Sequence, residues 1–204
     1  MPAHGQGEHK LISMGIDLAG SKSRPTGICI LSDNLARAFT VYGDDEIVDL
    51  AIKWKPHIIA IDAPLALPKG KSLNSKYCIR ECDRELRKMG IKFFPINFGG
   101  MRQLTIRGIR LRKRLSSLGF NVIETYPGAA QDILGLPRAK RNPNELRRRL
   151  IEMFNLKLIA ECKITTHILD AITCAIVGKM FLEGKYMALG DPTEILMILP
   201  EASR

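Results

Sequence analysis

The chain has 204 residues, which is enough for one well-packed domain and short for two. No apolar run approaches the roughly 20 residues that span a bilayer, and the first ten residues lack the apolar core of a signal peptide, so the sequence predicts a cytoplasmic protein without a membrane anchor. Its five cysteines, an odd number, fit a reducing compartment.

The net charge of +10 is concentrated in two segments. Residues 98–120 contain six Arg and Lys residues and no acidic residue. Residues 137–149 contain six Arg and Lys residues and one acidic residue, so the remainder of the chain is close to neutral. Such an excess indicates that the protein binds a polyanion such as DNA or RNA. The alternative is that these residues only form an arginine-rich helix face exposed to solvent. The expected nucleic-acid-binding residues are Arg102, Arg107, Arg110, Arg112, Lys113, Arg114, Arg138, Lys140, Arg141, Arg147, Arg148 and Arg149.

Strands dominate the first part of the chain. Residues 11–18, 26–31 and 35–42 are rich in Ile, Val, Leu and Thr, and the Ser-Asp-Asn link at 32–34 has turn chemistry. Connections this short make antiparallel neighbours, so we expect a three-stranded meander.

A crossover follows the meander. The spacing of apolar residues predicts an amphipathic helix that ends before Pro56. These residues are Ile47, Leu50, Ala51 and Trp54. Residues 57–61 then indicate a strand buried on both faces, which we expect to return parallel to the first strand.

The rest of the chain is mainly helical. We expect a single domain over 1–204 with a flexible N-terminus at 1–10, a helical insertion at 66–118 and an irregular or edge-packed C-terminal appendage at 184–204. The expected elements are helices from 74 or 75 to 89 and at about 101–118, a fifth strand at 120–125, and helices at about 144–155 and 165–183.

Three acidic residues, Asp17, Asp62 and Glu124, each lie at or near the end of an apolar stretch. A charge is rarely placed beside a buried strand unless something neutralises it. If the strands are parallel, the carboxylates gather at one edge of the sheet and supply oxygen ligands for a divalent cation. Three strand ends wetted by solvent are the alternative.

Together the elements predict an α/β fold with a mixed five-stranded sheet, order 3-2-1-4-5, and helices on both faces. In that order the three acids lie on adjacent strands at the carboxyl edge, where open α/β sheets place their ligands. This is the ribonuclease H-like arrangement.

Five phrases over about residues 11–182 resemble an uncharacterised prokaryotic family labelled "predicted nuclease, ribonuclease H-like fold". They are Gly15-Ile-Asp-Leu-Ala-Gly-Ser21, Ile61-Asp-Ala-Pro-Leu65, Arg80-Glu-Cys-Asp-Arg84, Glu124-Thr-Tyr-Pro-Gly128 and Leu169-Asp-Ala-Ile-Thr-Cys-Ala175. The resemblance implies phosphodiester hydrolysis with one or two Mg²⁺ or Mn²⁺ ions.

The resemblance also implies roles for particular residues. By similarity to resolvases of the RuvC type, Asp17, Asp62 and Asp170 would be metal ligands, with Glu124 as a further ligand. His167 lies on one helix face with Asp170 and would orient water or move a proton. The alternative is that His167 only forms a hydrogen bond with a neighbouring residue and has no role in catalysis. Arg80 and Asp83 would brace the site or meet phosphate, although for Asp83 we favour an ion pair on the helix surface.

Two other functions remain open. The Asp17–Ser21 phrase is also similar to the phosphate-binding hairpin of the sugar-kinase superfamily, but those enzymes need a second domain for which 204 residues leave no room. The other is a non-catalytic nucleic-acid-binding or scaffold protein. Metal-dependent cleavage of nucleic acid distinguishes the nuclease from both.

Overall fold

The structure, a computed structural model, describes residues 10–201. The N-terminus expected to be flexible at 1–10 lies outside the described residues, apart from Lys10. Within the described range, no helix is both long and apolar enough to cross a membrane.

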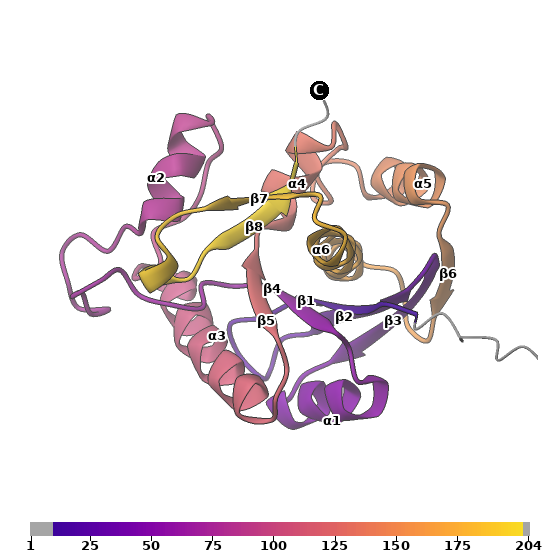
Figure 1. Ribbon diagram of the computed structural model, residues 1–204, viewed down its shortest axis with the longest axis horizontal. Helices are drawn as coiled ribbons and strands as arrows, with labels where there is room; N and C mark the ends of the chain where they lie inside the picture. Colours follow the sequence, from indigo (N-terminus) through magenta and orange to yellow (C-terminus); the bar gives the residue numbers. More distant parts are fainter. Residues whose placement is uncertain (1–9, 202–204) are drawn as a thin grey trace, which may run out of the picture.

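A single mixed sheet runs through the molecule, in the order β6-β3-β2-β1-β4-β5-β8-β7 (Figure 1). The five expected strands lie side by side in the predicted order 3-2-1-4-5, with β1 antiparallel to β2 and parallel to β4, so the ribonuclease H-like sheet is confirmed. The strands are β1 (Ile12–Asp17), β2 (Thr26–Ser32), β3 (Leu35–Val41), β4 (Ile58–Asp62), β5 (Val122–Thr125), β6 (Lys157–Ala160), β7 (Tyr186–Leu189) and β8 (Met197–Pro200).

The sheet is wider than the five strands expected. β6 pairs in parallel with β3, and β8 pairs in parallel with β5 and antiparallel with β7. Two of these added strands lie in the segment at 184–204, which therefore extends the sheet and includes the 3₁₀ turn Pro192–Glu194. Each added strand has four residues, too few for a period-2 pattern to reveal it.

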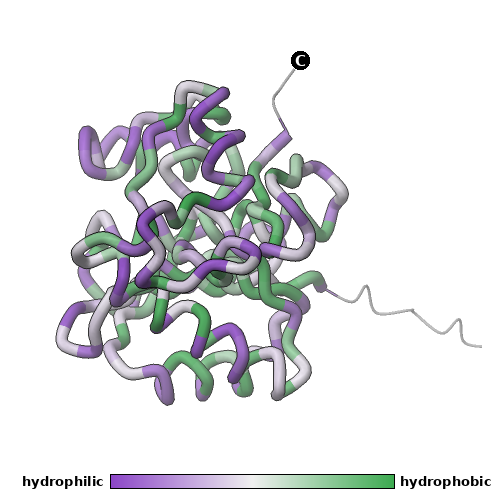
Figure 2. The backbone as a smooth tube through the Cα atoms, turned by 90° about the vertical axis from the view of Figure 1, so that its left-hand side faces the viewer, coloured by the Kyte–Doolittle hydropathy of each residue, from purple (hydrophilic) through white to green (hydrophobic). Residues whose placement is uncertain are grey.

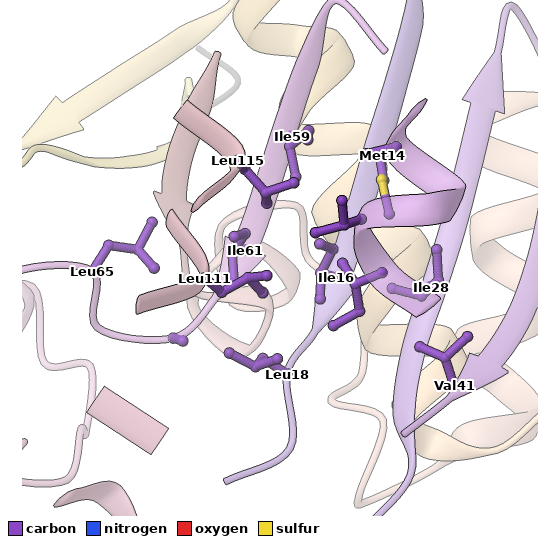
Figure 3. Packing of buried hydrophobic residues seen from close by; sticks show 14 of the residues in the cluster. Met14, Ile16, Leu18, Ile28, Val41, Ile59, Ile61, Leu65, Leu111 and Leu115 are labelled. Atoms are coloured by element: carbon purple, nitrogen blue, oxygen red, sulfur yellow. The ribbon is translucent and has the colours of Figure 1, made fainter. Parts of the chain in front are cut away.

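Helices cover both faces of the sheet, as predicted (Figure 1). Helices α1 and α3 supply Ile47, Val48, Leu111 and Leu115 to the core on one face, which is drawn in Figure 3. Helices α4, α5 and α6 pack on the other face, and α2 lies beside β7. The bounds are α1 (Asp44–Trp54), α2 (Glu81–Lys88), α3 (Gly99–Ser117), α4 (Pro127–Ile133), α5 (Pro143–Phe154) and α6 (Thr166–Leu182).

Most outer helices have one face on the core, so hydrophilic and hydrophobic stretches alternate along them in Figure 2.

Two differences from the expected helices concern α2 and α4. Helix α2 begins at Glu81 rather than near residue 74, because the preceding segment is held as a loop by Arg102, which donates to the Leu73 carbonyl at 2.7 Å. Helix α4 begins with Pro127 in its first turn, where the sequence indicated only a turn.

Helix α6 lies directly on the backbone of β1 and β2. A Cβ added at Gly15 would lie 2.1 Å from the Ala171 carbonyl oxygen, and one added at Gly27 would lie 2.3 Å from that of His167. Only glycine allows such an approach. These two glycines therefore set the height of α6 above the sheet and the position of His167 at its start.

We expect Gly15→Ala to lower the free energy of unfolding by about 3 kcal/mol, because the new methyl group meets helix backbone that can yield only by moving α6. Urea unfolding measures the change. Gly100→Ala is the matched control, since nothing lies within 4 Å of a Cβ at that position. Equal stability of the two variants would contradict the close contact.

Candidate functional site

Asp17 and Asp62 end the neighbouring strands β1 and β4. They are direct register partners across the parallel pair, so their side chains lie on the same face of the sheet. Asp17 also pairs with Gly27, whose missing side chain faces the start of α6. Both carboxylates therefore belong to the α6 face at the carboxyl edge.

The first two turns of α6 bring His167 and Asp170 to this edge. Thr165 caps the helix by accepting a hydrogen bond from the Ile168 amide. Atom Nδ1 of His167 lies 2.5 Å from Oδ2 of Asp17, and this hydrogen bond raises the pKa of the imidazole. The sequence placed His167 and Asp170 on one helix face, and the structure brings that face to Asp17.

Asp17, Asp62 and Asp170 form what we call the carboxylate cluster. Burial raises the pKa of Asp62 well above its ordinary value, and the charges of Asp17 and Asp170 raise it further. Burial and the charge of Asp17 raise the pKa of Asp170 to about 6. Asp17 and Asp170 each have a hydrogen-bond partner, whereas among residues 10–201 none is found for the Asp62 carboxyl group. The surrounding protein thus stabilises the charged forms of Asp62 and Asp170 poorly.

Gln131, a residue that the sequence did not single out, holds Asp170 in place. Its side chain is 1% exposed, and Nε2 donates to Oδ1 of Asp170 at 2.8 Å and to Oγ1 of Thr173 at 3.1 Å. Its Oε1 accepts from the Ala139 amide, so the same residue fixes the loop that carries Lys140. Lys140 is exposed, and its charge partly offsets the rise in the pKa of Asp62.

Glu124 does not join the carboxylate cluster. It pairs with Ile61 rather than with Asp62, and this offset of one residue turns its side chain to the α3 face. There Oε2 accepts from the Leu65 amide and from Nη1 of Arg80, each at 2.7 Å. Glu124 therefore lies near the expected edge of the sheet but on the opposite face from Asp17 and Asp62.

Arg80, Asp83 and Glu124 form what we call the buried ion network. Arg80 is 2% exposed and donates from Nη2 to Oδ1 of Asp83 at 3.0 Å, in addition to its bond to Glu124. Burial acts to lower the pKa of Arg80, but the Coulomb attraction of Glu124 and Asp83 raises it overall. The ion pair expected for Asp83 forms with Arg80, but its expected location on the helix surface is wrong, because both side chains are buried.

A sequence profile described as "Protein of unknown function (DUF429)" matches residues 15–195. The chain belongs to this family. A search of curated proteins gave no match.

Among solved structures, the chain is similar to Thermus thermophilus RuvC at 13% identity, with 85% of this chain and 97% of RuvC covered and a TM-score of 0.49. It is also similar to the yeast mitochondrial Holliday junction resolvase Ydc2 at 13% identity, with 81% of this chain and 76% of that chain covered and a TM-score of 0.39.

The basic residues expected to bind nucleic acid do not share one surface, because α3 and α5 cover opposite faces of the sheet. Arg107 is unavailable to a ligand. It is 7% exposed, and its guanidinium donates to Oδ1 of Asp44 and to the carbonyls of Ala19 and Tyr42. It therefore ties together the segments that follow β1 and β3, which corrects the expectation from charge alone.

Several of the other expected basic residues also have acidic or backbone partners. Arg102 bonds to the loop before α2, and salt bridges join Arg114 to Asp45, Arg138 to Asp132, and Arg148 to Glu145 and Glu152. Within residues 10–201 the remaining members make no salt bridge; they are Arg110, Arg112, Lys113, Lys140, Arg141, Arg147 and Arg149. Of these, Lys140 is the one whose charge acts on the carboxylate cluster.

The donor chemistry of the carboxylate cluster fits a hard divalent cation such as Mg²⁺ or Mn²⁺, and the unpartnered Asp62 carboxylate is the group that a cation would neutralise. The side chains are not preset for one: among the described residues, no group of three or more His, Cys, Asp and Glu is arranged to hold an ion. His167 also engages Asp17. Holding a cation would therefore require these side chains to turn toward a common point.

The metal-free protein should lose stability as the pH rises. Because the pKa of Asp170 is about 6 in the folded protein against an ordinary 3.8, its contribution to stability is complete at low pH and is lost as the pH rises through about 6. We expect a loss on the order of 2 kcal/mol from this group between about pH 4 and 7, measured by urea unfolding with a chelator. Asp170→Asn should remove that part of the slope, whereas Asp49→Asn, at an exposed position on α1, should keep it.

Proposed function

We propose that this protein is a divalent-metal-dependent nuclease that hydrolyses phosphodiester bonds, with Asp17, Asp62 and Asp170 as ligands for Mg²⁺ or Mn²⁺. The observation that carries the proposal is the carboxylate cluster, in which Asp62 is partly buried beside two other acids and has no hydrogen-bond partner of its own among residues 10–201. A bound divalent cation would activate water and stabilise the charge on the leaving oxygen.

The chain's own residues would supply positioning and proton transfer. Because Nδ1 of His167 lies against Asp17, Nε2 is the ring atom left to accept or donate a proton, and the half-exposed ring is open to solvent and substrate. Gln131 would keep Asp170 directed toward the cluster. Lys140 is positioned to attract a phosphate, since its charge acts on the same carboxylates. Glu124 would act indirectly, through the buried ion network.

The test is a cleavage screen with single-stranded and double-stranded DNA and RNA, hybrids and branched junctions, each with Mg²⁺, Mn²⁺ or a chelator. We expect metal-dependent cleavage by the wild type and by Asp49→Asn, and none by Asp17→Asn. Cleavage that survives Asp17→Asn would overturn the proposal, since a contaminating nuclease or another site would then be responsible. Tight binding of nucleic acid without cleavage under any of these conditions would favour the non-catalytic binding protein instead.

A further inference from the structure

Three aromatic side chains stand out on the surface. Tyr77 is 70% exposed, Phe94 is 73% exposed and Phe98 is 77% exposed, whereas every other aromatic side chain of the described residues is less than half exposed. All three belong to the insertion at 66–118. Phenylalanine is normally buried, and a group of large apolar side chains on a surface is typical of a binding site.

The segment at 92–100, which carries Phe94 and Phe98, is anchored at both ends near the edge of the sheet where Asp17 and Asp62 lie. At one end, the Tyr126 hydroxyl donates to the Lys92 carbonyl at 3.1 Å. Tyr126 directly follows Thr125, which is the register partner of Asp62 on β5. At the other end, the Gly100 carbonyl oxygen lies 3.4 Å from the position of a Cβ on Gly20, three residues after Asp17. The segment that carries the two phenylalanines is therefore held at one end near the end of β4 and at the other end near the loop that follows Asp17.

The third aromatic residue belongs to a segment tied to this one. Nδ2 of Asn97 donates to the Ser75 carbonyl at 3.0 Å, which joins the residue beside Phe98 to the loop that leads to Tyr77. Lys76 lies over the Tyr77 ring at 5.6 Å from its centroid. The three rings thus belong to one pair of connected loops.

Positive charge predominates in the segment that carries the rings. Between residues 66 and 98 the exposed charged side chains are all basic, and of these only Arg84 makes a salt bridge within the described residues; they are Lys69, Lys71, Lys76, Arg84, Arg87, Lys88 and Lys92. The core of a protein–protein interface is depleted of lysine and other charges. Exposed rings among unpaired lysines instead match nucleic acid, whose bases stack on the rings while its phosphates meet the lysines.

We propose that Tyr77, Phe94 and Phe98 form a stacking platform for unpaired bases, and that the substrate is nucleic acid with a single-stranded or splayed segment beside the scissile bond. The proposal rests on the nuclease function proposed above and adds the substrate class. Bases within an intact duplex are stacked on each other and cannot lie on these rings, so single-stranded nucleic acid should bind more tightly than duplex.

The experiment measures binding by fluorescence anisotropy in the Asp17→Asn background, with a single-stranded oligonucleotide and the matching duplex. Phe94→Ala and Phe98→Ala should each weaken single-strand binding roughly tenfold and leave duplex binding within about twofold. Phe94→Tyr should retain the affinity because it keeps the ring. Ile52→Ala removes an exposed apolar side chain on α1 and is the control expected to change nothing.

A second readout reports stacking itself. A 2-aminopurine base in the oligonucleotide should lose fluorescence on binding when it stacks on a ring, and this quenching should be reduced in Phe94→Ala and Phe98→Ala. Equal losses for single strand and duplex, or unchanged affinity and quenching in both variants, would overturn the platform. If binding depends on the rings but the wild type cleaves no substrate, the nuclease proposal is overturned and the stacking platform stands. If the protein cleaves single strand and duplex equally and neither ring affects cleavage, the stacking platform is overturned and the nuclease proposal stands.

Discussion

Asp62→Asn is expected to leave the protein inactive and more stable. The carboxylate is partly buried beside Asp17 and Asp170 with no partner found in the described chain, so removing its charge relieves repulsion and desolvation. We expect the free energy of unfolding at neutral pH to rise by at least about 1 kcal/mol in the absence of metal. Under the proposed nuclease function, the cleavage rate should fall by about a thousandfold or more, because the variant would lose a metal ligand worth several kcal/mol in the transition state.

Thermal unfolding with and without Mn²⁺ tests both parts. The wild type should be stabilised by Mn²⁺, because the ion binds the native state preferentially, and Asp62→Asn should show little of this shift. Asp49→Asn changes an exposed carboxylate on α1 and should behave as the wild type in stability, metal response and cleavage. An Asp62→Asn protein that keeps its activity or its Mn²⁺ response would show that the cluster does not bind the ion.

Arg80→Met is expected to have the largest effect on stability. Arg80 is 2% exposed and is the cation that neutralises Glu124, which is 1% exposed, and Asp83, which is 3% exposed. Its removal would leave two buried carboxylates without their partner, at a cost of about 3–5 kcal/mol. Urea unfolding measures this loss. Arg80→Lys should recover only part of it, because an ammonium group cannot replace the forked contacts of the guanidinium.

Arg84→Met is the matched control on the same helix. Arg84 pairs with Glu81 at the surface, where both side chains are more than one third exposed, so the loss should stay below about 1 kcal/mol. A triple variant, Arg80→Met with Asp83→Asn and Glu124→Gln, should recover much of the stability lost in Arg80→Met, because no buried charge then remains. Equal effects of Arg80→Met and Arg84→Met would contradict the buried ion network.

The residues that could be predicted from the sequence are those whose role follows from local pattern. Near-continuous apolar runs before Asp17 and Asp62 marked strands buried on both faces, and the short turn between β2 and β3 determined their antiparallel pairing. The crossover through α1 then placed β4 beside β1. The adjacency of Asp17 and Asp62 follows from these steps, and the helical spacing of His167 and Asp170 placed both on one face of α6.

Features that depend on a distant partner were not predictable in this way. Strands β6 and β8 form because the edges of β3 and β5 are free to pair with them, and their own sequences do not indicate strands. Arg107 occurs in a charged stretch typical of a surface, and it is buried because carboxyl and carbonyl groups from other segments accept its hydrogen bonds. The nearby pair of Arg80 and Asp83 is buried together with a distant acid, Glu124 on β5, which also accepts from Arg80.

The composition of the site was decided in the same way. The side chain of Glu124 lies on the α3 face because Glu124 pairs with Ile61, the residue before Asp62. Successive side chains of a strand point to opposite faces of the sheet, so this difference of one residue places Glu124 on the face opposite Asp62. Gln131 bonds to Asp170 because α4 packs beside α6, a contact between residues far apart in the chain. The amino-acid sequence determined which carboxylates end the central strands, since period and polarity are local, whereas register and helix packing, which are set by long-range contacts, decided which of them meet.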